Sequence, residues 1–169
     1  MAEGKTNVLF VCLGNICRST MAEGIFQSIA RKEPYDELVG VIDSCGTGAY
    51  HIGDGPDSRT MWKLQENGIT NYVHQARKVQ LSDFDKFDYI FAMDRSNLSD
   101  LQSLQQRREK SKGEPRAKVM LFGEYAGMGK AEVVHDPYYG GKEGFEEAYQ
   151  RCLKYTNNFL AKLTEEKGK

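Results

Sequence analysis

The chain has 169 residues, a length that predicts one domain over residues 1–169 and suffices for a hydrophobic core without disulfide or metal staples. Hydrophobic residues make up 40% and charged residues 28%, which excludes wholesale disorder, and 23 Lys and Arg against 24 Asp and Glu argue against a nucleic-acid-binding protein. No run approaches about 18 apolar residues and the N-terminus lacks a signal peptide's apolar core, so we expect a cytoplasmic protein that does not bind membranes.

Apolar, strand-like runs alternate along the chain with amphipathic, helix-like segments. Strands are expected at 7–11, 39–44, 89–93 and 118–122, and helices at 21–30, 58–67, 96–107 and 144–163. This alternation predicts a single-domain α/β fold, a four-stranded parallel, doubly wound sheet flanked by helices. The charged segment 107–116 is expected to be a solvated loop. Segment 123–143 has no clear pattern, and a stretch that long favours a functional role.

The loop after the first strand is the main candidate for a ligand site, because open parallel sheets bind ligands beyond the carboxyl ends of their strands. If its backbone N–H groups converge at the start of the next helix, they form an anion cradle reinforced by the helix dipole. Gly14 and Asn15 would supply the unusual backbone geometry. We expect this phosphate-binding loop to comprise Leu13, Gly14, Asn15, Ile16, Cys17, Arg18 and Ser19.

Cys12 lies at the base of this loop, a setting that lowers a thiol pKa from ~8.5 to roughly 3.5–7.5 and favours the thiolate. Arg18 follows six residues later, and its planar guanidinium can hold two phosphate oxygens at once. Ser19 is close enough to hydrogen-bond the Cys12 sulfur and ease its departure. This set suits phosphoryl transfer without a metal or other cofactor, because backbone dipoles and Arg18 balance the charge.

Seven segments then resemble the low-molecular-weight protein tyrosine phosphatase family, of the eukaryotic-like acid phosphatase type. In chain order they are 11–19 (Val-Cys-Leu-Gly-Asn-Ile-Cys-Arg-Ser), 21–23 (Met-Ala-Glu), 43–44 (Asp-Ser), 87–90 (Phe-Asp-Tyr-Ile), 93–94 (Met-Asp), 97–98 (Asn-Leu) and 136–139 (Asp-Pro-Tyr-Tyr). They cover the chain from about residue 7 to 163 in family order. The first and last are the most specific, and the family's four-stranded parallel sheet agrees with the strands expected above.

The resemblance implies the roles of the catalytic groups. Cys12 resembles the nucleophile that forms a phosphocysteine intermediate, Arg18 the phosphate clamp and Asp136 the general acid and base. Pro137 biases Asp136 away from helix and leaves its carboxyl free on a loop. The family's supporting residues, which hold the phosphate loop in shape or organise the acid loop, correspond to Asn15, Ser19, Ser44, His74 and Asp94.

The implied substrates are phosphotyrosine-containing proteins and small aryl phosphates, with inorganic phosphate or similar oxyanions as competing ligands. The implied cleft walls are Tyr50, His51, Tyr138 and Tyr139. A narrow aromatic slot over a deep cradle favours phosphotyrosine, because phosphoserine is too short to reach the nucleophile. We expect a monomer.

Two departures from the family pattern affect the supporting residues. Thr20 stands where the family usually has a proline, which preorganises the start of a helix, so some rigidity of the loop is expected to be lost. The segment 71–74 is one residue longer than the common spacing, which bears on the position assigned to His74.

Each candidate also has a plainer interpretation. Cys17 is either a small apolar filler or the thiol that captures oxidised Cys12 as a reversible disulfide, as the family parallel favours. The remaining residues with a structural interpretation are Cys45 and Cys152 as packing thiols, His74 as a structural histidine, His51 and His135 as surface residues, and Tyr138 and Tyr139 as loop aromatics.

Other function classes are less well supported. The chain has no nucleotide-binding glycine motif after the first strand and no second ligand pair for a zinc site. An arsenate reductase on the same scaffold needs further cysteines near residues 80–95, where there are none. A phosphotyrosine-binding module would gain nothing from an acid and a nucleophile, so a phosphatase is the favoured interpretation.

Overall fold

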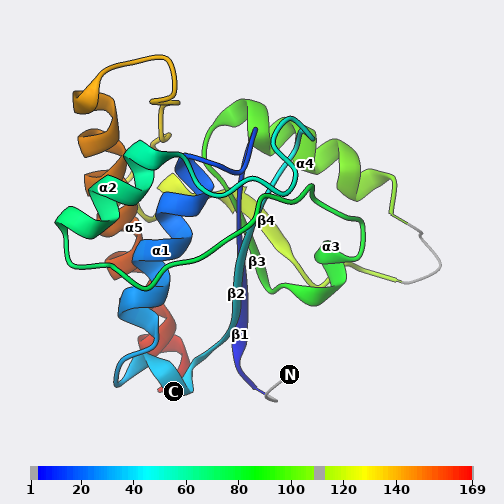
Figure 1. Cartoon of the computed structure of the whole chain (residues 1–169). Helices are drawn as coiled ribbons and strands as arrows, with labels where there is room; N and C mark the ends of the chain where they lie inside the picture. Colours follow the sequence, from blue (N-terminus) through cyan, green and yellow to red (C-terminus); the bar gives the residue numbers. More distant parts are fainter. Residues whose placement is uncertain (1–3, 109–112, 169) are drawn as a thin grey trace.

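In the computed structural model, which describes residues 4–108 and 113–168, the strands form one sheet with the order β2-β1-β3-β4 (Figure 1). Their bounds are β1 Thr6–Cys12, β2 Val39–Gly46, β3 Tyr89–Ala92 and β4 Lys118–Leu121. Every neighbouring pair is parallel. The expected four-stranded parallel α/β fold is therefore confirmed.

Helices cover both faces of the sheet (Figure 1). On one face lie α1 Arg18–Ala30, α2 Ser58–Glu66 and α5 Lys142–Lys167, and on the other α3 Asp83–Lys86 and α4 Arg95–Gln106. The described residues also include two short 3₁₀ helices, η1 Tyr35–Glu37 and η3 Phe122–Ala126. Neither these nor α3 were predicted, because three to five residues are too few to show a helical period.

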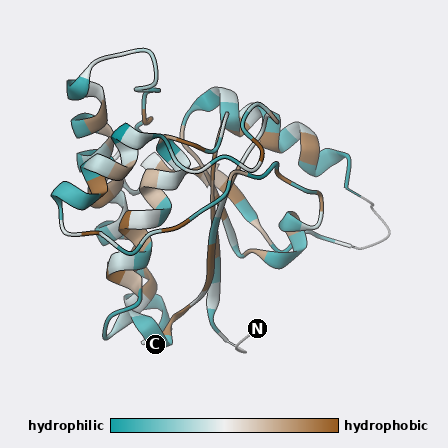
Figure 2. Cartoon of the chain, in the orientation of Figure 1, coloured by the Kyte–Doolittle hydropathy of each residue, from teal (hydrophilic) through white to brown (hydrophobic). Residues whose placement is uncertain are grey.

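The core explains why the first strand is a continuous apolar run. All seven residues of β1 are buried, since both faces of this strand are covered. Val8 and Phe10 pack with α1 and α5, whereas Leu9 and Val11 pack on the opposite side with residues that include Phe84. Figure 2 shows the hydrophobic colour concentrated along these central strands. Within the described residues, none of the helices is long and apolar enough to cross a bilayer.

The first helix begins earlier than its apolar pattern predicts, at Arg18 rather than residue 21. Ser19 and Thr20 are polar but fully buried, so apolar periodicity cannot detect this first turn. The solvated loop expected at 107–116 lies partly outside the described residues, at 109–112. Arg108 does not fit the expectation, because it is buried and pairs with Asp85 at 2.7 Å.

Candidate active site

The loop between β1 and α1 has the backbone of an anion cradle. Asn15 adopts a φ of 58°, in the left-handed region that few residues other than glycine enter. Within the described residues, no protein acceptor receives the backbone N–H groups of Gly14, Ile16 and Cys17, which line one cavity. The loop leads into the first turn of α1, where the helix dipole adds positive potential. The loop therefore offers hydrogen-bond donors to a tetrahedral anion.

The Cys12 residue lines the same cavity and is only 3% exposed. The Asn15 amide donates to its sulfur at 3.3 Å, and Ser19 Oγ lies 3.0 Å from the sulfur. Because the Asn15 side-chain amide donates to Ser19 Oγ at 2.8 Å, the Ser19 hydroxyl proton is free to point at the sulfur. Two donors thus stabilise negative charge on this atom, as a nucleophile and leaving group requires.

Arg18 lies beside Cys12 with its guanidinium almost fully buried. Its Nη1 donates to Asp94 Oδ2 at 2.6 Å and to the Val134 carbonyl at 3.0 Å. Burial opposes the charge of Arg18, but the Cys12 sulfur and the Asp94 carboxylate outweigh it and raise the guanidinium pKa. Asp94 is itself fixed as the N-cap of α4, in a capping box with Asn97. The Arg18 guanidinium is therefore permanently charged and is held in one position by its hydrogen bonds.

Asp136 reaches the cavity from the long connection before α5. Its Oδ2 is 3.7 Å from Arg18 Nη2, while its Oδ1 accepts the Tyr138 amide at 3.0 Å. Its side chain is 37% exposed, so water can reach the carboxyl. The structure thus brings together the three predicted catalytic residues, although they lie up to 124 positions apart along the chain.

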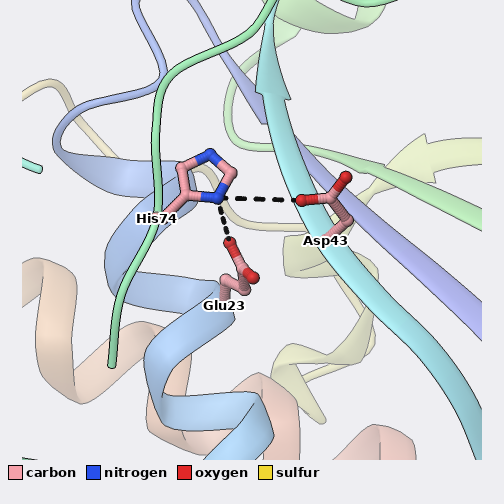
Figure 3. A group of neighbouring side chains, drawn as sticks. All are labelled: Glu23, Asp43 and His74. Carbon is pink, nitrogen blue, oxygen red and sulfur yellow. Dashed lines mark ion pairs between the residues drawn. The ribbon is translucent and has the colours of Figure 1, made fainter. Parts of the chain in front are cut away.

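A buried polar cluster supports the phosphate loop from behind. His74 Nδ1 lies 3.3 Å from Glu23 Oε1 and 3.7 Å from Asp43 Oδ1 (Figure 3). His74 Nε2 lies 2.7 Å from Asn15 Oδ1, and because that oxygen can only accept, Nε2 carries a proton. Ser44 accepts from Asn15 Nδ2 and donates to Glu23 Oε1, at 2.9 and 2.6 Å. The cluster thereby fixes the Asn15 side chain on both of its polar atoms.

Burial controls the charge of this cluster. It raises the pKa of Glu23 to about 7, although Ser44 and Tyr72 donate hydrogen bonds to the carboxyl, and it lowers the pKa of His74. Both shifts favour neutral side chains. The donor types of Glu23, Asp43 and His74 would also suit a divalent cation, but in this structure hydrogen bonds with other protein groups occupy them.

Sequence reasoning found part of this support and missed part. It selected Asn15, Ser19, Ser44, His74 and Asp94, all of which contact the phosphate loop or Arg18. It assigned no role to Glu23, Asp43 or Tyr72. The available signal was the acidic side chain of Glu23 within the buried run of α1, where a carboxyl needs partners.

Aromatic side chains wall a cleft of about 440 Å³ above Cys12. The Tyr138 and Tyr139 rings meet edge-to-face at 4.9 Å, and Tyr50 and His51 line the cleft from the segment after β2. The exposed fractions of Tyr139 and Tyr50 are 89% and 73%. These rings are therefore available to a flat aromatic ligand. His135, expected at the surface, is exposed.

The four cysteines are free and buried. Burial and the Asp57 carboxylate raise the pKa of Cys17, which keeps this thiol neutral. Burial also raises the pKa of Cys152 to about 12 and that of Cys45 well above its ordinary value. Cys45 and Cys152 pack within the two apolar cores, as packing thiols do.

Thr20 restrains the phosphate loop by hydrogen bonding. Its hydroxyl faces the carbonyl oxygens of Ile16 and Cys17, at 2.8 and 3.0 Å. The same two carbonyls accept from α2 and its N-cap, namely from the Asp57 amide at 2.8 Å and the Thr60 hydroxyl at 3.3 Å. A proline would restrain the loop by its ring, whereas in this chain a shared hydroxyl supplies the restraint.

Known proteins resemble this chain in sequence and in fold over most of its length. The family described as "Low molecular weight phosphotyrosine protein phosphatase" matches residues 7–169. A relative of that name from Schizosaccharomyces pombe is 52% identical over 156 residues, which are 92% of this chain and 96% of the relative. The crystal structure of Drosophila arginine phosphatase, DARP, has a TM-score of 0.82 at 37% identity and covers 93% of this chain and 97% of that one.

A protein tyrosine phosphatase from Entamoeba histolytica has a TM-score of 0.80 at 35% identity and covers 96% of this chain and 99% of its own. These likenesses extend over nearly the whole chain and include the sheet that positions the loop after β1. Such agreement in sequence and fold establishes the class of enzyme. The chain belongs to the low molecular weight phosphotyrosine protein phosphatases, which are hydrolases acting on phosphomonoesters.

Proposed function

We propose that this chain hydrolyses phosphotyrosine in proteins, and small aryl phosphates, through a phosphocysteine intermediate on Cys12. One observation carries the proposal: the Cys12 sulfur, the Arg18 guanidinium and the Asp136 carboxyl face a single cleft. Asp136 Oδ2 lies 3.7 Å from Arg18 Nη2, so acid and clamp are neighbours. A phosphate held by the loop would have the nucleophile on one side and the acid near its ester oxygen.

In the first step, the Cys12 thiolate attacks phosphorus and the bond from phosphorus to the aryl oxygen breaks. Arg18 and the loop N–H groups receive the charge on the other three oxygens. Asp136, protonated at this stage, gives its proton to the departing phenolate. Its Oδ1 is already engaged by the Tyr138 amide, which leaves Oδ2 for the proton transfer.

In the second step, the Asp136 carboxylate accepts a proton from water while that water attacks the phosphocysteine. The phosphorus–sulfur bond breaks, inorganic phosphate leaves, and the sulfur returns to its thiolate form. The Ser19 hydroxyl, 3.0 Å from the sulfur, stabilises this leaving group. Inorganic phosphate and similar oxyanions would compete with the substrate for the same loop.

The walls of the cleft support an aryl substrate. Tyr50, Tyr138 and Tyr139 offer exposed ring area to a phenyl group, which packs well against aromatic faces and edges. A phosphoserine side chain has no such group and is shorter. One structural neighbour is named an arginine phosphatase, so phosphoarginine is an informative competitor in any test of substrate.

Cys17 is proposed as the thiol that protects Cys12 from overoxidation. Hydrogen peroxide converts the Cys12 thiolate to a sulfenic acid, and the Cys17 sulfur then displaces water to form a disulfide. The two cysteines line the same cavity, which supports this pairing; because burial and the Asp57 carboxylate raise the pKa of Cys17, its thiol must lose its proton as it attacks. Its capture of oxidised Cys12 would be reversed by a reductant.

The proposal is tested by hydrolysis of p-nitrophenyl phosphate at mildly acidic pH, with chelator and reductant present. Wild type is expected to turn over, whereas Cys12→Ser loses turnover and still binds inorganic phosphate in calorimetry. Peptides bearing phosphotyrosine, phosphoserine and phosphoarginine are then compared by kcat/KM, with phosphotyrosine expected to be highest. Turnover retained by Cys12→Ser would refute the covalent mechanism, and preference for phosphoarginine would refute the substrate.

A further inference from the structure

Arg59, in the first turn of α2, reaches across to the loop that carries Asp136. Its Nε and Nη2 pair with the Asp57 carboxylate, each at 3.0 Å, which fixes the plane of the guanidinium. Its Nη1 donates to the backbone oxygen of Tyr138 at 3.1 Å. The guanidinium carbon lies 5.3 Å from the Tyr138 ring centroid and 4.7 Å from that of Phe145. One side chain therefore holds Tyr138 by both its backbone and its ring.

The contact continues from Tyr138 to the acid. The Tyr138 amide donates to Asp136 Oδ1 at 3.0 Å, so this residue is held by Arg59 through its carbonyl and holds Asp136 through its amide. Among the described residues, Arg59 is the only side chain that donates a hydrogen bond into residues 136–141. From outside that segment, the described residues also contribute the ion pair between Arg18 and Asp136 at 3.7 Å and a backbone hydrogen bond from the Gly144 amide to the Gly141 carbonyl at 3.1 Å.

The other end of Arg59 is anchored to the phosphate loop. The Asp57 carboxylate accepts the Arg59 amide at 2.8 Å as the N-cap of α2, and the Asp57 amide donates to the Ile16 carbonyl at 2.8 Å. The Asp57 side chain is only 11% exposed and that of Arg59 is 42% exposed, so this ion pair is half-buried. A series of hydrogen bonds therefore connects the phosphate loop, through Asp57 and Arg59, to residues 136–141, the acid loop.

We propose that Arg59 is a positioning residue for the general acid, which keeps the Asp136 carboxyl beside the leaving-group oxygen. The inference rests on the acid role proposed for Asp136. An arginine is needed because its planar fork can pair with Asp57, donate to Tyr138 and stack on two rings at once, whereas a lysine offers one point charge. Loss of this contact lets the acid loop leave its place without disturbing the phosphate clamp.

The test compares two substrates whose leaving groups differ in their need for a proton. For Arg59→Ala, kcat/KM on phenyl phosphate should fall about tenfold, equivalent to about 1.4 kcal/mol, while p-nitrophenyl phosphate, with its more acidic phenol, should change by no more than about twofold. Arg59→Lys should lie between wild type and Arg59→Ala on phenyl phosphate. The inhibition constant of inorganic phosphate should stay unchanged, because the phosphate loop is intact.

Lys63→Met is the matched control. Lys63 is a cation on the same helix and ties it to Glu146 of α5 at 2.7 Å, yet no contact links it to the acid loop within the described part of the chain. Its removal should leave the ratio of the two kcat/KM values unchanged. Thermal unfolding of each variant separates a loss of folded protein from a loss of acid positioning.

A second pair of variants distinguishes failure of this inference from failure of the proposed acid. In an Asp136→Ala background, Arg59→Ala should have no further effect on either substrate, because the group it positions is gone. Equal losses on both substrates for Arg59→Ala alone, or additive losses in the double variant, would overturn the positioning role. Equal losses on both substrates for Asp136→Ala would instead overturn the acid role itself.

Discussion

Replacement of Asn15 by alanine is expected to destabilise the folded protein by about 5–6 kcal/mol, most of it from lost hydrogen bonds. The Asn15 side chain donates to Ser19 and Ser44 and lies 2.7 Å from the protonated His74 Nε2, and it accepts the Arg77 amide at 3.1 Å. The Arg77 amide would lose its partner at a cost of about 1–3 kcal/mol, and the other three bonds are each worth roughly 0.5–1.5 kcal/mol net. Together these terms span about 2.5–7.5 kcal/mol and centre near about 5 kcal/mol.

The backbone adds a smaller term that a second variant isolates. At a φ of 58°, alanine pays roughly 1–2 kcal/mol that glycine does not, against about 0.5–1 kcal/mol for the greater chain entropy of unfolded glycine. Asn15→Gly should therefore lose the same hydrogen bonds but remain more stable than Asn15→Ala by about 0.5–1 kcal/mol.

Urea unfolding followed by circular dichroism measures these differences, with Asn157→Ala on an exposed position of α5 as the control. The control should stay within about 0.5 kcal/mol of wild type. If Asn15→Ala matched the control, the hydrogen bonds around Asn15 would not stabilise the fold. If alanine were more stable than glycine, the positive φ would carry no energetic weight.

Two further predictions concern Glu23 and Cys17. Burial raises the folded-state pKa of Glu23 from 4.5 to about 7, so its protonated form stabilises the fold below about pH 4.5 and this stability is lost as the pH rises through 7. One pKa unit corresponds to about 1.4 kcal/mol. Between about pH 4.5 and 8, wild type should therefore lose about 3 kcal/mol of unfolding free energy relative to Glu23→Gln. If the difference in unfolding free energy between the two proteins stayed constant with pH, this prediction would be wrong. Wild type that has been treated with peroxide should recover its activity with dithiothreitol. The Cys17→Ser variant should recover less activity, and mass spectrometry should show sulfinic acid at Cys12. Equal recovery by the two proteins would exclude the protective disulfide.

The sheet and the position of the loop after β1 could be predicted because their signals are local. A buried parallel strand is a continuous apolar run; Cys12 is the last residue of that strand, and Arg18 follows it six positions later at the start of α1. Asp136 could be selected as a candidate site residue because Pro137, Tyr138 and Tyr139 follow it in the sequence. These features need no knowledge of which distant segments meet.

The support of the site could not be predicted as fully, because it depends on tertiary contacts. Tyr72 donates to Glu23 across 49 positions of the chain, and no pattern near either residue shows this. Arg59 looks like an ordinary surface cation at the start of a polar helix until the fold brings Tyr138 and Phe145 to its faces. Helix α3, with four residues, is too short for periodicity to reveal.

The orientation of the carbonyls in the phosphate loop has a consequence for the protonation state of its ligands. The Ile16 oxygen accepts from Thr20 and Asp57, and the Cys17 oxygen from Thr20 and Thr60, so these acceptors are engaged by the protein. The N–H groups of Gly14, Ile16 and Cys17 are left for the ligand, which thus meets donors along this backbone. A singly protonated phosphate ester brings a hydroxyl proton, for which these N–H groups offer no acceptor. The dianion brings only hydrogen-bond acceptors. The backbone of the loop therefore favours the dianion, which forms at the second ionisation of the phosphate near pH ~6, and it selects ligands by protonation state as well as by tetrahedral shape.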